Sequence, residues 1–171
     1  MSICFEAKLS KIENHTIVKI PISSSQQLPS RGMVMIQGTI NNKSFKAPLE
    51  PDGMGSHWLE LTDILMADTG LNIGQTAVFE IEPTDEWTEP IIPDDIMDAI
   101  MREGNIDHWN SLTTKARWEW LRWIRSTKNS QTRQKRINVA CDKLQKGDKR
   151  PCCFDASRCT IPEVSKSGVL F

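Results

Sequence analysis

Tryptophans and arginines are interspersed over residues 117–125, a combination that can bind planar or anionic groups. The tryptophans Trp118, Trp120 and Trp123 lie one or two residues from an arginine. Such a cluster can stack on bases or hold an anionic ligand, because guanidinium groups attract anions and aromatic faces stack on planar groups. At helical spacing, Trp120 and Trp123 share the apolar stripe of the segment and are expected to pack in a core. Trp118 falls off the stripe and is expected at a surface or an inter-domain contact.

Basic residues dominate the segment 115–150, with twelve lysines and arginines against three acids, a local charge of +9. Residues 1–93 carry −6. A positive field of this kind attracts polyanions, which makes nucleic-acid binding through 115–150 one alternative. A solvated helix surface that offsets the acidic half is the other. The candidate residues for binding a partner or anion are Trp123, Lys128, Arg133, Lys135 and Arg136.

Three of the five cysteines gather near the end of the sequence, as Cys152, Cys153 and Cys159. Adjacent thiols close to a third can chelate a soft metal or exchange disulfides. Structural zinc takes four ligands, usually in two close pairs, and this spacing does not match. Because the three thiols lie close together in the sequence, a thiol or metal protein is a second alternative. The spacing itself predicts no particular metal or cofactor. Cys4 and Cys141 fall inside strand-like and helix-like patterns, where a thiol behaves as a small hydrophobic residue.

No catalytic arrangement is evident. His15, His57 and His108 have no serine or aspartate at motif spacing, so no hydrolytic triad is predicted. The composition, 39% hydrophobic and 25% charged, is typical of a globular protein. No apolar stretch approaches the roughly 20 residues of a membrane-spanning helix, and the first residues lack the apolar run of a signal peptide. We therefore expect a non-enzymatic protein located in the cytoplasm.

Short strands dominate the first half. Asn41-Asn42 predicts a two-residue hairpin turn, and Thr62 or Asp63 is expected to cap a short helix that stops at Gly70. Six short strands suggest a small barrel, because curling hides the strand edges. The expected strands are 3–9, 15–20, 33–40, 43–49, 57–61 and 75–82.

Helical periodicity replaces the strands in the second half. Prolines and acids at 83–93 predict an extended linker. Three helices follow: the first from Pro93 to Gly104, the second capped by Ser111 or Thr113, and the third capped by Ser130. The third shows an apolar i, i+3, i+4, i+7 pattern at Ile137, Ala140, Cys141 and Leu144.

Several segments resemble the bacterial YdeI/OmpD-associated family, also called the bacteriocin-protection family: FEAKL, MVMIQGTINNKSFKAPL, GLNIGQTAVFEIE and KGDKRPCC. The helical motif of that family, W-I-x-x-x-K-x-x-x-T-R-x-x-R-I, is matched by Trp123, Ile124, Lys128, Thr132, Arg133, Arg136 and Ile137. The resemblance implies an N-terminal double-split barrel of unknown function, a helical domain, and a role in stress or antimicrobial-peptide tolerance. Relatives of the barrel dimerise and bind DNA, but the negative charge of this half is unfavourable for contacting phosphates.

The sequence thus predicts an α+β protein: a small β-barrel over 1–83, a linker over 84–93, a three-helix domain over 94–147, and a loosely ordered tail over 148–171. The expected partner is a protein or a small anionic ligand. Nucleic acid is not favoured, no membrane span is expected, and a homodimer is compatible with the resemblance.

Overall fold

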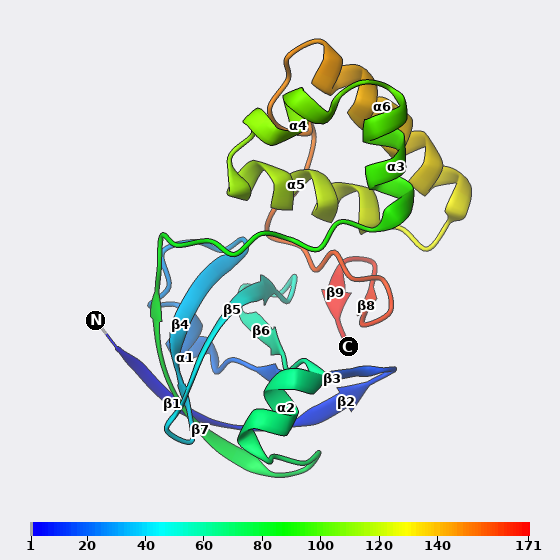
Figure 1. Ribbon diagram of the computed structural model, residues 1–171. Coiled ribbons are helices and arrows are strands. Elements are labelled where there is room, and N and C mark those ends of the chain that lie inside the picture. The colour runs from blue at the N-terminus through cyan, green and yellow to red at the C-terminus, as the bar shows by residue number, and fades with distance from the viewer. Residues whose placement is uncertain (1) are drawn as a thin grey trace. The chain divides into compact units, whose positions relative to one another are not determined.

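The computed structural model describes residues 2–171, which divide into two compact units (Figure 1). The first unit contains the chain up to Glu86, together with Ala156–Cys159 and Glu163–Phe171. The second contains Trp87–Asp155 and Thr160–Pro162. Strands form the first unit and helices the second, so the fold is α+β as predicted. Among the described residues, no helix combines the length and the apolar character needed to cross a membrane.

The elements have the following bounds. The strands are β1 (Ile3–Lys8), β2 (Ser10–Ile12), β3 (His15–Lys19), β4 (Val34–Ile40), β5 (Lys43–Pro51), β6 (His57–Glu60), β7 (Thr76–Pro83), β8 (Ser165–Lys166) and β9 (Val169–Leu170). The helices are α1 (Ile22–Ser25), α2 (Asp63–Thr69), α3 (Asp94–Arg102), α4 (Ile106–Ser111), α5 (Thr114–Arg125) and α6 (Ser130–Gln145).

Seven strands form one antiparallel sheet in the order β1-β7-β4-β5-β6-β3-β2. Its two edge strands, β1 and β2, are separated in the chain by Leu9 alone, so the sheet curls until both edges belong to one bent strand. Leu9 is buried at the bend, and its N–H donates to the Gln75 carbonyl at 2.9 Å. The result is a curled half-barrel, which limits the exposure of free strand edges. The sequence pattern does not predict β2, because a strand of three mostly polar residues shows no clear alternation.

The β4–β5 hairpin forms at the predicted turn. Ile40 pairs with Lys43, and Asn41 and Asn42 have φ values of 46° and 68°, the left-handed region that asparagine tolerates. The Asn41 side chain accepts a hydrogen bond from the Val78 N–H at 2.8 Å. The turn is therefore attached to β7 as well as closing its own hairpin.

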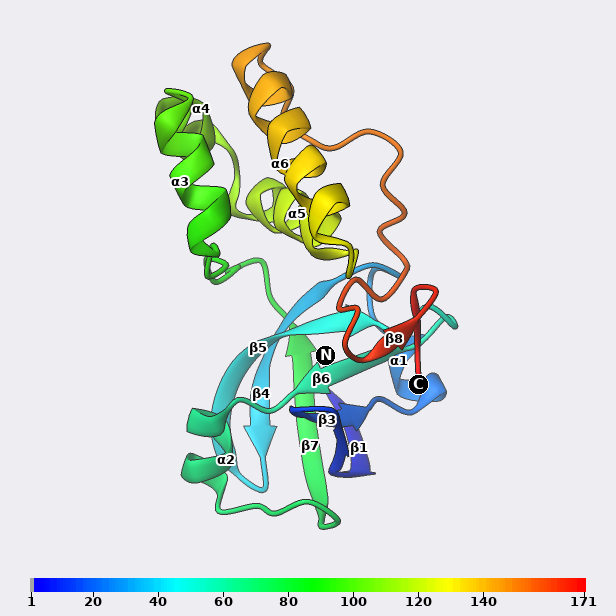
Figure 2. The same ribbon diagram turned by 90° about the vertical axis from the view of Figure 1, so that its right-hand side faces the viewer.

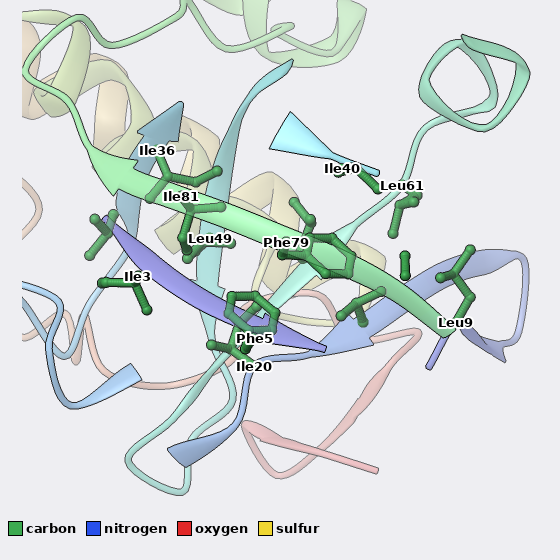
Figure 3. Close-up of a cluster of buried hydrophobic side chains, with 14 of the residues drawn as sticks. Ile3, Phe5, Leu9, Ile20, Ile36, Ile40, Leu49, Leu61, Phe79 and Ile81 are labelled. Carbon is green, nitrogen blue, oxygen red and sulfur yellow. The ribbon is translucent and has the colours of Figure 1, made fainter. Parts of the chain in front are cut away.

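The core of the half-barrel comes from alternate residues of each strand (Figure 3). Phe5 of β1 lies opposite Phe79 of β7, and the two rings stack with centroids 5.0 Å apart and planes within 5°. Ile36, Leu49 and Ile81 are fully or almost fully buried beside them. Because side chains in a strand alternate between faces, the neighbouring residues of β1 and β7 point outward. Cys4 is one of these and is exposed, contrary to the expectation of a small core residue.

The second unit contains the three predicted helices as α3, α5 and α6, with the short α4 added between α3 and α5. Figure 2 shows α6 beside α3 and α5, two of the helices that it contacts. Thr113 caps α5 by accepting a hydrogen bond from the Ala116 N–H, as predicted. Asn129, rather than Ser130, caps α6. The sequence pattern misses α4 because its six residues bury only Trp109.

Residues 148–171 differ from the loosely ordered tail that the sequence predicts. Val164 is fully buried, and β8 pairs with β9. In the first unit, the Leu170 N–H donates to the Asp52 carbonyl at 2.7 Å and the Cys159 N–H donates to the Gly168 carbonyl at 2.9 Å. Backbone hydrogen bonds between distant positions hold this segment, and such bonds leave no periodic signal in the sequence.

Replacing Gly38 tests the close approach of β4 to β7. A Cβ atom here would overlap the Glu80 carbonyl oxygen and lie 2.8 Å from the Ile81 Cα, and only a strand shift can move these backbone atoms. We expect Gly38→Ala to lower the free energy of unfolding by about 3 kcal/mol, the scale of overpacking, measured by urea denaturation with far-UV circular dichroism. Ser44→Ala, at an exposed position of β5, is the control and should stay within about 0.5 kcal/mol of the parent. Equal losses in the two variants would contradict the prediction.

Candidate partner-binding surface

The junction of α5 and α6 contains all five candidate residues. As predicted, α6 buries Ile137, Ala140, Cys141 and Leu144. Arg133, Lys135 and Arg136 lie off this apolar stripe and are partly or fully exposed. Trp120 is completely buried, whereas Trp123 is only partly buried and meets Trp120 edge-on, with ring centroids 5.9 Å apart. Of the two tryptophans expected in the core, Trp123 therefore lies at its rim.

Arg136 connects α6 to the last turn of α5. Its Nη1 donates to the Trp123 carbonyl at 2.9 Å and to the Ser126 hydroxyl at 2.7 Å. Its guanidinium carbon lies 5.7 Å from the centre of the Trp123 ring, a cation–π distance. Carbonyls in the last turn of a helix lack intrahelical partners, so Arg136 satisfies one of them. This arginine positions Trp123 and the junction.

Arg133 connects α6 to the first turn of α3. Its Nε donates to Asp95 Oδ2 at 2.8 Å and its Nη2 donates to Asp95 Oδ1 at 2.9 Å, a two-point pairing. The hydrogen bonds from Arg133 lower the pKa of Asp95, which outweighs the opposing effect of burial. Arg133 thus holds two helices together through an acid that the sequence places 38 positions away.

Lys128 and Lys135 are the exposed cations of the candidate set. Within residues 2–171, neither ammonium group has a carboxylate partner at ion-pair distance. The five candidate residues therefore fall into two groups: Trp123, Arg133 and Arg136 make contacts inside the unit, and the two lysines face solvent.

Much of the remaining charge of 115–150 is engaged within the second unit. Carboxylates pair with several of its cations, among them the pairs Arg117–Glu89, Arg133–Asp95, Lys143–Asp148, Lys146–Asp142 and Arg150–Glu119. Arg122, which the sequence pattern groups with the surface cations, is 2% exposed; its guanidinium lies 5.3 Å from the Phe154 ring centre. These pairings weaken the field that the sequence suggests for nucleic-acid binding.

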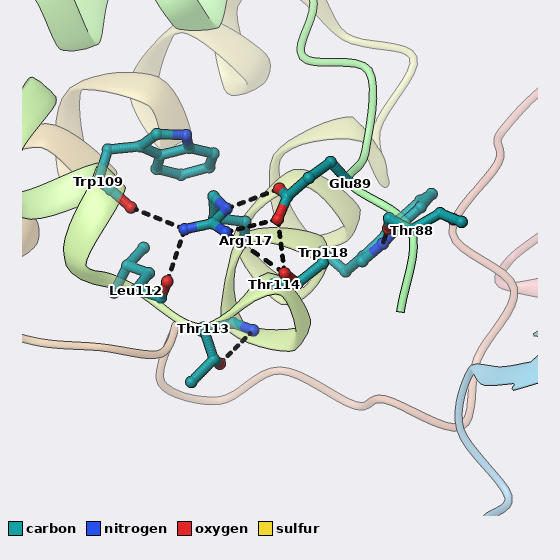
Figure 4. Close-up of polar contacts among 9 residues, drawn as sticks. Thr88, Glu89, Trp109, Leu112, Thr113, Thr114, Arg117 and Trp118 are labelled. Carbon is teal, nitrogen blue, oxygen red and sulfur yellow. Dashed lines mark hydrogen bonds and ion pairs between the residues drawn. The ribbon is translucent and has the colours of Figure 1, made fainter. Parts of the chain in front are cut away.

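Residues 87–90, part of the predicted linker, lie against α5 (Figure 4). Arg117 donates from Nε and Nη2 to the two oxygens of Glu89, at 2.9 and 2.6 Å, and Thr114 donates to the same carboxylate at 2.5 Å. Hydrogen bonds from Arg117 lower the pKa of Glu89. The Trp118 indole N–H donates to the Thr88 carbonyl at 2.7 Å. We call residues 87–90 the strap. Its contact with α5 explains why Trp118, which lies off the apolar stripe, is partly buried and has a hydrogen-bond partner.

One pocket of about 330 Å³ lies along α6 and contains none of the candidate residues. Its lining carries two carboxylates, and one of them, Asp142, already pairs with Lys146 at 2.9 Å. Burial raises the pKa of the Cys141 thiol, so that group stays protonated at neutral pH. The lining residues are Glu103, Asn138, Cys141, Asp142 and Gln145.

The three cysteines of the thiol or metal alternative differ in their exposure. Cys152 and Cys153 are exposed and Cys159 is buried, and none of the three forms a disulfide. Across the described chain, no three histidine, cysteine, aspartate or glutamate side chains gather as ligands of one metal ion.

A serine–histidine contact that the sequence does not predict lies inside the half-barrel unit. Ser25 Oγ is 2.6 Å from His57 Nδ1, and His57 Nε2 is 2.7 Å from the Gly32 carbonyl oxygen. Arg31 also donates to Ser25 Oγ, at 3.1 Å. Both Ser25 and His57 are at most 1% exposed, so a substrate does not reach this serine. Sequence spacing gives no signal, because the two residues are 32 positions apart.

Two family models match the chain, one in the helical part and one in the strand part. Residues 89–147 match the family model described as bacteriocin-protection, YdeI or OmpD-associated. Residues 5–81 match the model of a domain of unknown function, DUF1905. The first match covers α3 to α6, and the second begins within β1 and ends within β7 of the half-barrel. No curated protein matches the chain.

Glu89→Gln tests the strap. A neutral amide has one acceptor oxygen in place of two charged ones, so the pairing with Arg117 weakens. We expect amide hydrogen exchange at residues 87–89 to become about fivefold faster, equivalent to the roughly 1 kcal/mol of a well-formed exposed ion pair. Asp85→Asn, which removes a charge at a nearby exposed position, is the control. Unchanged exchange at the strap in Glu89→Gln would show that Arg117 does not hold it.

The Asp95–Arg133 pair predicts a pH dependence of stability. The pKa of Asp95 is lower in the folded protein than its ordinary value. The contribution of the pair to the free energy of unfolding is therefore complete when the pH is above the ordinary pKa, and it is lost as the pH falls through the folded-state pKa. We expect Asp95→Asn to lower the free energy of unfolding at neutral pH by at most about 1 kcal/mol, since the carboxyl is half exposed, and to change it little in strong acid. Urea unfolding followed by tryptophan fluorescence measures this. Asp94→Asn shares the same helix turn without this partner, and an equal pH effect there would refute the assignment.

Proposed function

We propose, from the matches of residues 5–81 to the DUF1905 model and of residues 89–147 to the bacteriocin-protection, YdeI or OmpD-associated model, that this chain is a non-enzymatic binding protein that supports tolerance to bacteriocins or related stress. Its action would then lie in the cytoplasm, because cysteines that form no disulfide suit a reducing environment. Its partner is a protein with an acidic surface or a small anionic ligand.

The observation that carries the proposal is the exposure of Lys128 and Lys135 on the scaffold of α5 and α6. Arg133 and Arg136 fix the helix that bears Lys135, and Arg136 also holds the ring of Trp123. Cations without a carboxylate neighbour are available to an external anion, and a fixed helix reduces the entropy lost when that anion binds. The partner therefore contacts the lysines and the exposed edge of Trp123, while the two arginines act as positioning residues.

This division of roles decides which substitutions test the surface. Removing Arg133 or Arg136 would break contacts inside the unit, so lost function in those variants would not identify a binding role. Lys128→Glu with Lys135→Glu changes the charge of the surface without removing an internal ion pair. Lys8→Glu with Lys11→Glu makes the same change of charge at exposed positions of β1 and β2.

We expect bacteria that express the Lys128→Glu, Lys135→Glu variant to lose bacteriocin tolerance to the level of cells without the protein. The minimal inhibitory concentration of a bacteriocin measures this, and the Lys8→Glu, Lys11→Glu variant should retain the tolerance of the parent. Both variants should unfold within about 0.5 kcal/mol of the parent, as exposed substitutions do.

Full tolerance in the Lys128→Glu, Lys135→Glu variant would remove the two lysines from the proposal, and no tolerance with the parent protein would remove the function itself. The nucleic-acid alternative is separated by titrating short DNA and RNA while following tryptophan fluorescence at two salt concentrations. Binding that weakens by roughly a thousandfold or more between 50 and 200 mM salt would favour that alternative over the proposed partner.

A further inference from the structure

Two adjacent thiols, Cys152 and Cys153, lie exposed in a turn of the second unit. The residue before them, Pro151, is buried, and Phe154 after them is partly buried beneath the Arg122 guanidinium, 5.3 Å from the ring centre. The Trp120 indole N–H donates to the Lys149 carbonyl at 3.1 Å. The turn is thus held on both sides, and it presents both sulfur atoms to solvent.

The spacing of the two residues disfavours a disulfide between them. Neighbouring Cα atoms across a trans peptide are about 3.8 Å apart, whereas disulfides usually join Cα atoms roughly 4.4–6.8 Å apart. Residues 2–171 contain no cis peptide bond. Both sulfurs therefore remain available as thiols.

The conformation lets the two sulfurs meet one ligand atom. Consecutive side chains of a strand point to opposite faces, but Cys152 and Cys153 lie in a turn, and Cys153 has a φ of 58°. Rotation about the side-chain bonds can then bring both sulfurs to one side. Their short separation suits a ligand atom that takes two sulfurs at a bent angle, and thiolates prefer soft ligands.

We propose that Cys152 and Cys153 form a binding site for a trivalent organic arsenical that carries two exchangeable hydroxyl groups. Each thiol gives its proton to one hydroxyl, so that two sulfur–arsenic bonds form, two arsenic–oxygen bonds break and two water molecules leave. Arsenic remains trivalent, and no oxidant or reductant takes part. The third position on arsenic keeps its organic group, so the site needs no third protein ligand.

Phenylarsine oxide, which is hydrated in water to the dihydroxy form, is the probe. We expect intact-mass spectrometry of the reduced full-length protein to show one arsenical per chain, and thiol titration to show the loss of two reactive thiols. A small dithiol should remove the adduct at a concentration at which a monothiol does not. Cys152→Ser and Cys153→Ser should each weaken binding at least a hundredfold.

Cys4→Ser is the matched control, because Cys4 is an exposed thiol on β1 with no cysteine beside it in the sequence. This variant should bind the arsenical as the parent does. Circular dichroism checks that the serine variants at 152 and 153 fold, which their exposure leads us to expect. Binding that survives either of these two substitutions, or that is lost in Cys4→Ser, would overturn the proposal. A disulfide between Cys152 and Cys153 that persists after treatment with a reducing agent would also overturn it.

Discussion

Carbonyl oxygens at the ends of short helices set the main requirement on the second unit. The last carbonyls of a helix have no intrahelical donor, and α4 has only six residues in which to satisfy its own. Arg117 Nη1 donates to the Trp109 and Leu112 carbonyls at 3.3 and 2.5 Å, and Arg136 Nη1 donates to the Trp123 carbonyl at the end of α5. Arginine suits this task because its planar group presents five donors in fixed directions.

The same arginines organise the charges around them. Arg117 also pairs with the Glu89 carboxylate. One side chain therefore satisfies carbonyls at the end of α4 and holds the strap against α5. Arg133 pairs with Asp95 at the start of α3, where a negative charge is also favourable to the helix dipole. A segment with a formal charge of +9 therefore has fewer available cations than its composition suggests, and Lys128 and Lys135 are among those that face solvent.

In the first unit, the corresponding constraint is that the edge strands of the sheet carry unpaired backbone N–H and C=O groups. Both edges belong to the strand that bends at Leu9, so the curl of the sheet and the burial of Leu9 depend on each other. The Phe5–Phe79 stack and the close approach at Gly38 then fix β1 and β4 on either side of β7. This unit is acidic, and its strand framework positions none of the five candidate residues.

The sequence by itself determined those features that depend on neighbouring residues. The Asn41-Asn42 turn, the Thr62 cap with its Gly70 stop, and the apolar stripe of α6 all follow local rules, because turn conformation, capping and the helical period act over at most a few residues. The helical motif likewise indicated the family whose model matches residues 89–147.

Only the tertiary structure decided how the charged and polar groups are used. The partner of Arg133 lies 38 positions away, that of Arg117 lies 28 away, and Ser25 meets His57 across 32 positions. The bend that creates β2, the strap and the packing of the final segment arise in the same way, from backbone and side-chain contacts with distant positions. Hydrogen bonds and ion pairs leave no period in the chain, so their partners, and with them the cations left for a ligand, are set when the elements pack.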